Sequence, residues 1–279
     1  MSIENIILKA WEDRNNINKN SDKAIISAIN ETLEKLDSGN IRVCEKKNNE
    51  WHTHQWIKKA ILLSFKTQDN KILSGPYTTW FDKVDGKTTL WNEKKHIDAG
   101  FRSVPNGVVR KSAYIGKNVV LMPSFINVGA YVDDGTMIDT WSTVGSCAQI
   151  GKNCHISGGV GIGGVLEPVQ AAPVIIEDNC FIGSRCIVVE GVRVETEAVL
   201  GAGVTLTMST KIIDVTGENP IEYKGVVPAR SVVIPGSYTK KFPAGDYQVP
   251  CAIIIGKRKE STDKKTSLND ALRDNSVAV

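Results

Sequence analysis

The sequence is poor in the residues that build metal sites. Only four histidines occur in 279 residues, and three of them, His52, His54 and His96, show no metal-ligand spacing. Six cysteines are present, but none forms a CxxC pair or a zinc-type cluster with histidine. We therefore expect no bound metal. We also expect reduced and mostly buried thiols at Cys44, Cys147, Cys154, Cys180, Cys186 and Cys251.

Net charge and long apolar runs are scarce as well. The formal net charge is +3, which gives no support to nucleic-acid binding. No apolar run approaches the roughly 20 residues that a membrane span needs. Residues 1–9 lack the charged-then-apolar pattern of a signal peptide. We expect a cytoplasmic protein with no nucleic-acid or membrane partner.

Residues 1–100 are predicted to form a small, mainly helical domain. Apolar residues at helical spacing indicate helices over 3–14 and 53–67. A third helix is expected to begin after an N-cap at Ser21 and to stop at Gly39. Residues 41–56 read as a hairpin that turns at Asn48-Asn49. The stretch 69–87 is rich in turn residues and stays ambiguous.

The region after residue 101 has a period of six. Aliphatic side chains recur at Val132, Ile138, Val144, Ile150 and Ile156, and the series extends through Ile162. We extend it backward through Ile126, Val120 and Tyr114, and it resumes in a shifted phase from Ile176 to Leu206. Neither a helix nor an ordinary strand has this period, but a triangular parallel β-helix does, because three hexads make one coil. Chance alternation in an ordinary sheet is the rejected alternative.

Further columns of the repeat support this interpretation. A small residue lies two positions before most of the aliphatic ones, where the chain must turn a tight corner; Ala130, Thr136, Ser142 and Ala148 are examples. Glycine often follows the aliphatic residue, which we attribute to unusual backbone angles at a turn. Fifteen hexads make five coils, roughly 25 Å tall at the spacing of hydrogen-bonded strands. The N-terminal domain and the C-terminal strands are expected to cover the open ends.

We therefore predict a mainly β protein with three parts. Residues 1–100 form the helical domain, and 101–236 form the β-helix, with excursions near 164–175 and 209–226. The second excursion is expected to hold a hairpin that turns at residues 217–219. Residues 237–279 supply C-terminal strands and a polar tail that we expect to be helical over 265–274.

Hexads such as "IGKNCH", "IGGVLE" and "FIGSRC" resemble the hexapeptide-repeat transferases. The run from Gly100 to Pro168, with "IIEDNCFIGSRCIVVEGV", "LDSGNIRV" and "WIKKAILLSF", resembles the tetrahydrodipicolinate N-succinyltransferase family of lysine and diaminopimelate biosynthesis. The resemblance implies a left-handed β-helix and a homotrimer with sites between neighbouring subunits. It also implies transfer of a succinyl group from succinyl-CoA, a co-substrate and not a tightly bound cofactor, to the amine of a dicarboxylate.

The resemblance also assigns candidate site residues. Arg102, in "GFR", matches the arginine that grips a substrate carboxylate, a task that suits the guanidinium fork. Asp139 occupies the position where Gly145 and Gly151 follow their aliphatic residues, and it matches the substrate-binding aspartate. It could hold the substrate ammonium and take its proton. Glu190, in "VVEG", is a second candidate base, and the two roles stay open between them. A covalent intermediate on Glu190 is chemically possible, but we favour direct attack by the amine.

Other candidates rest on weaker signals. His155 is the only histidine of the repeat, but it precedes an inward residue and should point outward, so a role at a subunit interface is favoured over catalysis. For coenzyme A we select Gly201 and Ala202 beside an exposed backbone, and Ser209, Lys211 and Lys257 as polar or cationic contacts. No phosphate-binding glycine loop of the known types occurs in the sequence.

Other functions on the same architecture fit less well. A nucleotidyltransferase would need an N-terminal α/β nucleotide domain, and a zinc carbonic anhydrase would need several coil histidines. An ice-binding helix would repeat one flat polar face. The remaining alternative is a hexapeptide-repeat acyltransferase with another acyl-CoA donor or amine acceptor.

Overall fold

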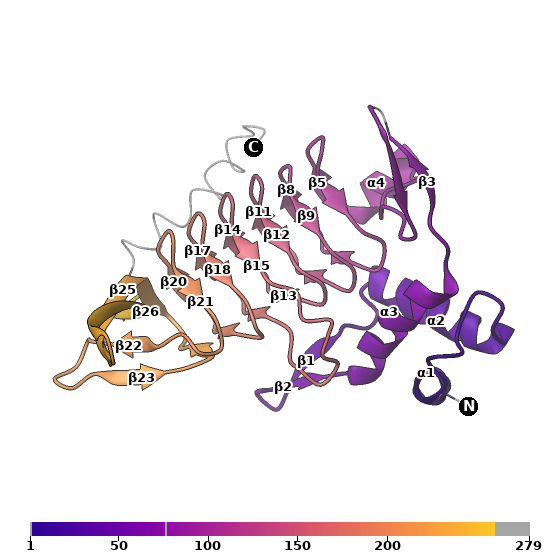
Figure 1. Ribbon diagram of the computed structural model, residues 1–279. Coiled ribbons are helices and arrows are strands. Elements are labelled where there is room, and N and C mark those ends of the chain that lie inside the picture. The colour runs from indigo at the N-terminus through magenta and orange to yellow at the C-terminus, as the bar shows by residue number, and fades with distance from the viewer. Residues whose placement is uncertain (1, 76, 260–279) are drawn as a thin grey trace.

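The computed structural model describes residues 2–75 and 77–259. Helical segments lie at one end of a prism of short strands, and long strands lie at the other end (Figure 1). The expected helical tail over 265–274 lies outside the described residues. None of the helices in the described residues is long and apolar enough to cross a membrane.

Three helices form the N-terminal core: α1 (Ile3–Glu12), α2 (Lys23–Asp37) and α3 (Gln55–Thr67). The expected N-cap at Ser21 is wrong by one residue, because the carboxylate of Asp22 accepts the N–H of Ala24 at 2.7 Å. The hairpin of β1 (Cys44–Lys47) and β2 (Glu50–Thr53) turns at Asn48-Asn49 as predicted, with φ of 50° and 66°. The ambiguous stretch forms a second hairpin, β3 (Lys71–Ser74) with β4 (Thr79–Asp82), and α4 (Glu93–Ala99) follows it.

The prism has three flat sides of parallel two-residue strands, which we name after the strands of one coil. The β11 side contains β5 (Arg102–Ser103), β8 (Val120–Leu121), β11 (Met137–Ile138), β14 (His155–Ile156), β17 (Phe181–Ile182), β20 (Val199–Leu200) and the start of β25 (Ser231–Phe242). The β12 side contains β6 (Val108–Val109), β9 (Phe125–Ile126), β12 (Thr143–Val144), β15 (Gly161–Ile162), β18 (Ile187–Val188) and β21 (Thr205–Leu206). The β13 side contains β7 (Tyr114–Ile115), β10 (Tyr131–Val132), β13 (Gln149–Ile150), β16 (Ile175–Ile176), β19 (Arg193–Val194) and β24 (Val226–Val227).

The second residue of each two-residue prism strand from β6 to β24 points into the core, as the hexad pattern predicts from Ile126 onward. The two end strands of the β11 side differ, because Ser103 of β5 is exposed and Val233, the third residue of β25, is the inward one. The backward extension is wrong at Tyr114 and Val120, because Ile115 and Leu121 are the buried residues. The corner between Leu121 and Ile126 is one residue short, which shifts the phase. The prism begins with β5 and β6, inside the predicted bounds of 101–236 but ahead of the hexad series traced from Tyr114, so each side holds six strands or more.

The small corner residues also form hydrogen bonds between coils. Their side chains donate hydrogen bonds to carbonyls of the next coil: Thr136 to Gly151 and Ser142 to Ser157, both at 2.7 Å. Cysteine thiols take the same role, as at Cys180, which donates to the Glu195 carbonyl at 3.1 Å. All six cysteines are buried free thiols, as expected. Burial raises the pKa of Cys147 to about 12.

The glycines that follow the aliphatic residues have another cause than the one we expected. Gly163 and Gly183 do not have left-handed backbone angles. A β-carbon on Gly183 would lie 2.6 Å from the Leu200 carbonyl oxygen, and one on Gly163 would lie 2.8 Å from a Val189 methyl group. These glycines therefore reflect the close approach of successive coils. The left-handed residues are found one or two positions later, as at Gly159 and Gly203.

Different elements close the two ends. Phe101 packs on the core at the corner position that Val119 and Thr136 hold in the next coils. At the other end, β26 (Gly245–Lys257) pairs with β25 and with β22 (Ile212–Asp214). The predicted hairpin is formed by β22 and β23 (Ile221–Tyr223). Helices α2 and α3 pack against Val128 and Cys147 along the edge between the β12 and β13 sides.

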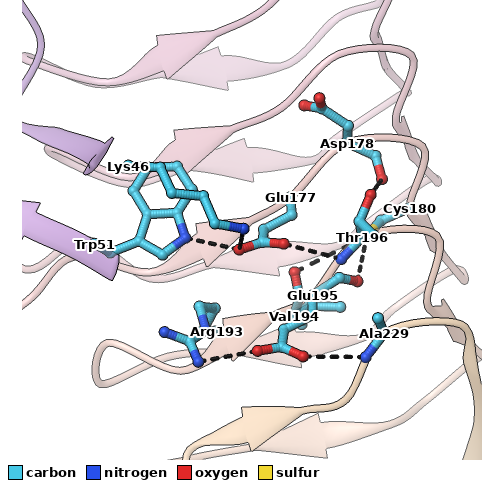
Figure 2. Close-up of polar contacts among 10 residues, drawn as sticks. All are labelled: Lys46, Trp51, Glu177, Asp178, Cys180, Arg193, Val194, Glu195, Thr196 and Ala229. Carbon is cyan, nitrogen blue, oxygen red and sulfur yellow. Dashed lines mark hydrogen bonds and ion pairs between the residues drawn. The ribbon is translucent and has the colours of Figure 1, made fainter. Parts of the chain in front are cut away.

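A buried carboxylate attaches the β1–β2 hairpin to the β13 side (Figure 2). Glu177 is 8% exposed and accepts hydrogen bonds from Trp51 Nε1 at 2.7 Å, Lys46 Nζ at 3.0 Å and Thr196 N at 3.1 Å. Burial raises the pKa of Glu177, but the bonds from Trp51 and Lys46 outweigh it and hold the pKa below its ordinary value. One ionised group therefore joins the two parts of the chain.

We expect Glu177→Gln to lower the free energy of unfolding at pH 7 by about 1–3 kcal/mol, the usual range for hydrogen bonds to a charged group. Because the folded pKa is depressed, this contribution is present above the unfolded pKa of about 4.3 and is lost as pH falls through the folded value. Urea unfolding at pH 7 and at pH 3 measures both effects. Glu50→Gln, on the exposed part of the same hairpin, should change neither.

Candidate functional site

Asp139 lies directly after β11, at the edge between the β11 and β12 sides. Its Oδ1 accepts the N–H of Thr140 at 2.6 Å and the Thr140 hydroxyl at 3.2 Å. Oδ2 lies near Gly158, where a β-carbon would be 4.0 Å away. Among the described residues no hydrogen-bond donor is recorded at Oδ2. One oxygen thus fixes the carboxylate, and the other is available to a ligand.

From the sequence we contrast Asp139 only with glycines, but other acids also occupy its position of the hexad. Glu177 and Glu195 hold the equivalent position on the edge between the β13 and β11 sides, and both are engaged in the structure (Figure 2). Glu195 accepts from Arg193 Nη2 at 3.0 Å and from Ala229 N at 3.2 Å. Both oxygens of each glutamate are therefore occupied, which distinguishes these two structural acids from Asp139. Asp133 holds the same hexad position and shares the pattern of Asp139, since its Oδ1 accepts the next N–H at 2.8 Å.

Glu190 lies at the edge between the β12 and β13 sides, directly after Val189. Its backbone φ is 60°, which is uncommon for a residue with a side chain, and Gly191 follows with φ 75°. The exposed side chain accepts the Met208 N–H at 3.1 Å. Positive φ recurs at the corners of the prism, as at Glu197 and Arg230, so this backbone geometry places the Glu190 side chain without assigning it a function.

Asp139 and Glu190 do not meet within one chain. They lie at opposite edges of the β12 side and two strands apart along the prism, since β12, β15 and β18 are successive neighbours. Two strand spacings alone amount to about 10 Å. A site that uses both carboxylates must therefore bring together edges from two chains.

Arg102 and His155 lie on the outer surface of the β11 side, in the column Arg102, Val120, Met137, His155. Arg102 is exposed, and Asp139 lies two strands further along the same side. The prediction that His155 points outward is confirmed, and its ring stacks on Phe181 with centroids 5.0 Å apart.

The coenzyme A candidates fall into three places. Gly201 and Ala202 lie on the same edge as Asp139, three strands further along. Small residues line the edge between them: Ser157, Gly158, Gly159, Gly183 and Ser184. This edge therefore leaves an accessible strip of backbone next to Asp139.

Ser209 lies instead beside Glu190, in the turn that Glu190 caps, where its hydroxyl is 3.1 Å from that of Thr207. Lys211 pairs with Glu222 at 2.6 Å, and Lys257 Nζ donates to the Ala229 carbonyl at 3.1 Å. Both lysines thus belong to the C-terminal strand region, and the structure does not bring them to Asp139.

Sequence reasoning missed two residues on the Asp139 edge. Trp141 and Arg185 have φ of 60° and 59° at the corner positions where Gly159 and Gly203 also have positive φ. Trp141 is 74% exposed, and the aliphatic part of Arg185 crosses Gly159. Comparing the corner column coil by coil would have found both, because bulky side chains there replace glycine.

The sequence matches two family models and is similar to several known proteins. The family model "Tetrahydrodipicolinate N-succinyltransferase N-terminal" matches residues 2–67, and "Hexapeptide repeat of succinyl-transferase" matches residues 173–208. A 2,3,4,5-tetrahydropyridine-2,6-dicarboxylate N-succinyltransferase of Pelagibacter ubique is 58% identical over 275 residues, covering 97% of this chain and 98% of the relative. The protein of that name from Cereibacter sphaeroides is 54% identical over 276 residues and covers 98% of each chain.

The chain belongs to this N-succinyltransferase family. Its members are acyltransferases, and the prism is the parallel β-helix that the six-residue period predicted, with the left hand that the resemblance to this family implied. A solved structure of a putative N-succinyltransferase from Campylobacter jejuni covers 86% of this chain and 64% of its own, with 13% identity and a TM-score of 0.48. That likeness is too low to add to the assignment.

Proposed function

We propose that the chain transfers the succinyl group of succinyl-CoA to the amine of tetrahydrodipicolinate, in its 2-amino-6-oxopimelate form, as a step of lysine and diaminopimelate biosynthesis. The observation that carries the proposal is similarity above 50% identity to N-succinyltransferases over nearly the whole chain. The accessible Oδ2 of Asp139 supports it, because the substrate ammonium must lose a proton before it can attack.

The residues take the following roles in the proposed reaction. Arg102 binds a substrate carboxylate through its guanidinium group. Asp139 holds the ammonium through Oδ2 and accepts one proton from it. The neutral amine attacks the thioester carbonyl and forms the N–C bond, the C–S bond breaks, and the coenzyme A thiolate takes up the second proton that the nitrogen loses. Glu190 is the second carboxylate of the site, and the assignment of the base stays open between it and Asp139.

Coenzyme A is a co-substrate in this proposal, not a resident cofactor. The strip of small residues between Asp139 and Gly201 is suited to the pantetheine arm, with backbone exposed at Ala202. Arg185 supplies a cation on this strip, and Ser209 lies on the Glu190 edge. Lys211 and Lys257 are further cations near the C-terminal strands.

We also propose a cytoplasmic homotrimer with sites shared between subunits. The helical domain covers the β13 side, but the β12 side keeps large apolar side chains exposed, namely Val108, Phe125 and Ile187, with Trp141 at its edge. Such a surface is typical of an interface. Contact between the Asp139 edge of one chain and the Glu190 edge of another would join the two carboxylates.

The alternative is an acyltransferase of the same fold with another acyl-CoA donor or amine acceptor. Comparing acetyl-CoA with succinyl-CoA separates the two possibilities, because only the succinyl group carries a terminal carboxylate.

We expect thiol release from succinyl-CoA to depend on tetrahydrodipicolinate, and Asp139→Asn to lower kcat by about 10²–10⁴-fold, the usual contribution of a general base. Asp133→Asn is the matched control. Asp133 holds the same hexad position on the edge between the β13 and β11 sides, and its Oδ1 likewise accepts the next N–H, at 2.8 Å. Release without the acceptor, or equal losses in the two variants, would contradict these roles.

Shared sites predict complementation between inactive chains. Asp139→Asn and Glu190→Gln should each be inactive alone. Co-expressed chains should regain about a quarter of wild-type activity, because one site in four then pairs an intact Asp139 with an intact Glu190 from a different chain. Light scattering should give three times the 30.4 kDa chain mass. A monomeric mass with full activity, or no recovery on co-expression, would refute shared sites.

A further inference from the structure

A fully buried lysine lies between the N-terminal helices and the first excursion of the β-helix. Lys58, on α3, is 0% exposed. Its Nζ donates to the carbonyl oxygens of Pro168 at 3.0 Å and Ala171 at 2.8 Å. No carboxylate pairs with this ammonium among the described residues. Burial lowers the pKa of Lys58. A buried charge with only carbonyl acceptors is costly, so a stability role alone explains it poorly.

The two carbonyls belong to the segment 164–173, which connects β15 to β16. The segment has little regular structure to hold it: Val165 N donates to the Ser146 carbonyl at 3.1 Å, and Ala171 N donates to Pro168 O within the segment. Leu166 packs against the apolar cluster of Ile57 and Ile61 on α3. The segment thus depends on α3 for an apolar contact and for the Lys58 hydrogen bonds.

The far end of the segment touches the Glu190 edge. A β-carbon built on Gly191 would lie 2.6 Å from the Ala172 carbonyl oxygen, so the backbone of this segment passes directly against the residue that follows Glu190. Just before its near end, a β-carbon built on Gly163 would lie 2.8 Å from the Val189 side chain, so the chain entering the segment also passes close to the residue before Glu190. The segment and the residue before it therefore lie against the chain on both sides of Glu190.

We propose that Lys58 is a positioning residue, whose ammonium fixes the segment 164–173 against the Glu190 edge and so holds the left-handed Glu190-Gly191 turn in place. The effect on catalysis rests on the proposed function, but the effect on the segment does not. Lys58 contacts no substrate in this proposal and acts through backbone carbonyls alone.

Hydrogen–deuterium exchange and kinetics of Lys58→Met test the proposal. Methionine keeps much of the side-chain length but cannot donate to the two carbonyls. We expect exchange in peptides covering 164–173 to rise at least tenfold, and kcat to fall about 10-fold with a smaller change in KM. The control is Lys87→Met. Lys87 is 8% exposed and bonds to Asp37, at 2.9 Å from its carboxylate, away from the segment. It should leave exchange in 164–173 unchanged.

The outcomes separate the two proposals. Unchanged exchange in 164–173 in Lys58→Met, or an equal rise in Lys87→Met, overturns the role of Lys58. Raised exchange with wild-type kcat shows that the segment does not act through Glu190 and overturns the catalytic part. A wild-type protein that releases no thiol with tetrahydrodipicolinate refutes the proposed function, and the exchange data still decide what Lys58 holds.

Two further variants test the proposal even if Lys58→Met does not fold. Lys58→Gln retains N–H donors on a shorter side chain and should raise exchange less than methionine does. Gly191→Ala should displace the segment from the other side, because its β-carbon would meet the Ala172 carbonyl, and should raise exchange in 164–173 with Lys58 intact. Protection of 164–173 equal to wild type in Gly191→Ala would refute the contact with the Glu190 edge.

Discussion

The structure depends on how a hexad turns its corner. Each full-length corner must connect one two-residue strand to the next within four residues, and it does so with a small inward side chain and, at most corners, a left-handed residue. The inward side chain at Thr136, Ser142 or Cys180 also donates to a carbonyl of the next coil, which links the coils by more than their strand hydrogen bonds. From β6 onward the inward positions of the prism strands hold only aliphatic side chains. Polar side chains that could take part in a reaction therefore lie at the corners and on the outer surface.

The three edges of the prism use their corners differently. On the edge between the β13 and β11 sides, Glu177 and Glu195 are fully engaged, and Glu177 attaches the N-terminal hairpin. The edge between the β12 and β13 sides carries α3, the segment 164–173 and Glu190. On the edge that holds Asp139, Trp141 is 74% exposed, and β25 approaches only the far end, at Gly201 and Gly203. The N-terminal region thus covers the β13 side through Arg42 and the β1–β2 hairpin, and the neighbouring edge through α3.

Much of this fold could be predicted from the sequence, because the hexad is a local rule. The aliphatic column from Ile126 onward, the small column and the outward His155 followed from spacing. The hairpins β1–β2 and β22–β23 followed from their turn residues, whereas the hairpin β3–β4 was not predicted. The misplaced phase at Tyr114 and Val120 came from a corner one residue short, which no periodic rule can anticipate. The contacts of Lys58 were equally hidden, because they join residues 110 and 113 positions apart. For Asp139, the sequence indicated an exception, but only the hydrogen bonds distinguish it from Glu177.

The rigidity of the prism constrains where a site can form. A coil cannot bend to bring its own edges together, because the packed core and the coil-to-coil hydrogen bonds fix the width of each side. Asp139 and Glu190 are therefore held apart within one chain, at opposite edges of the β12 side. That side also exposes large apolar residues, so the surface separating the two carboxylates is the one suited to contact another subunit. If the β12 side packs against a neighbouring chain, burial of this apolar surface and assembly of the two acids are a single event, and a monomer would lack both.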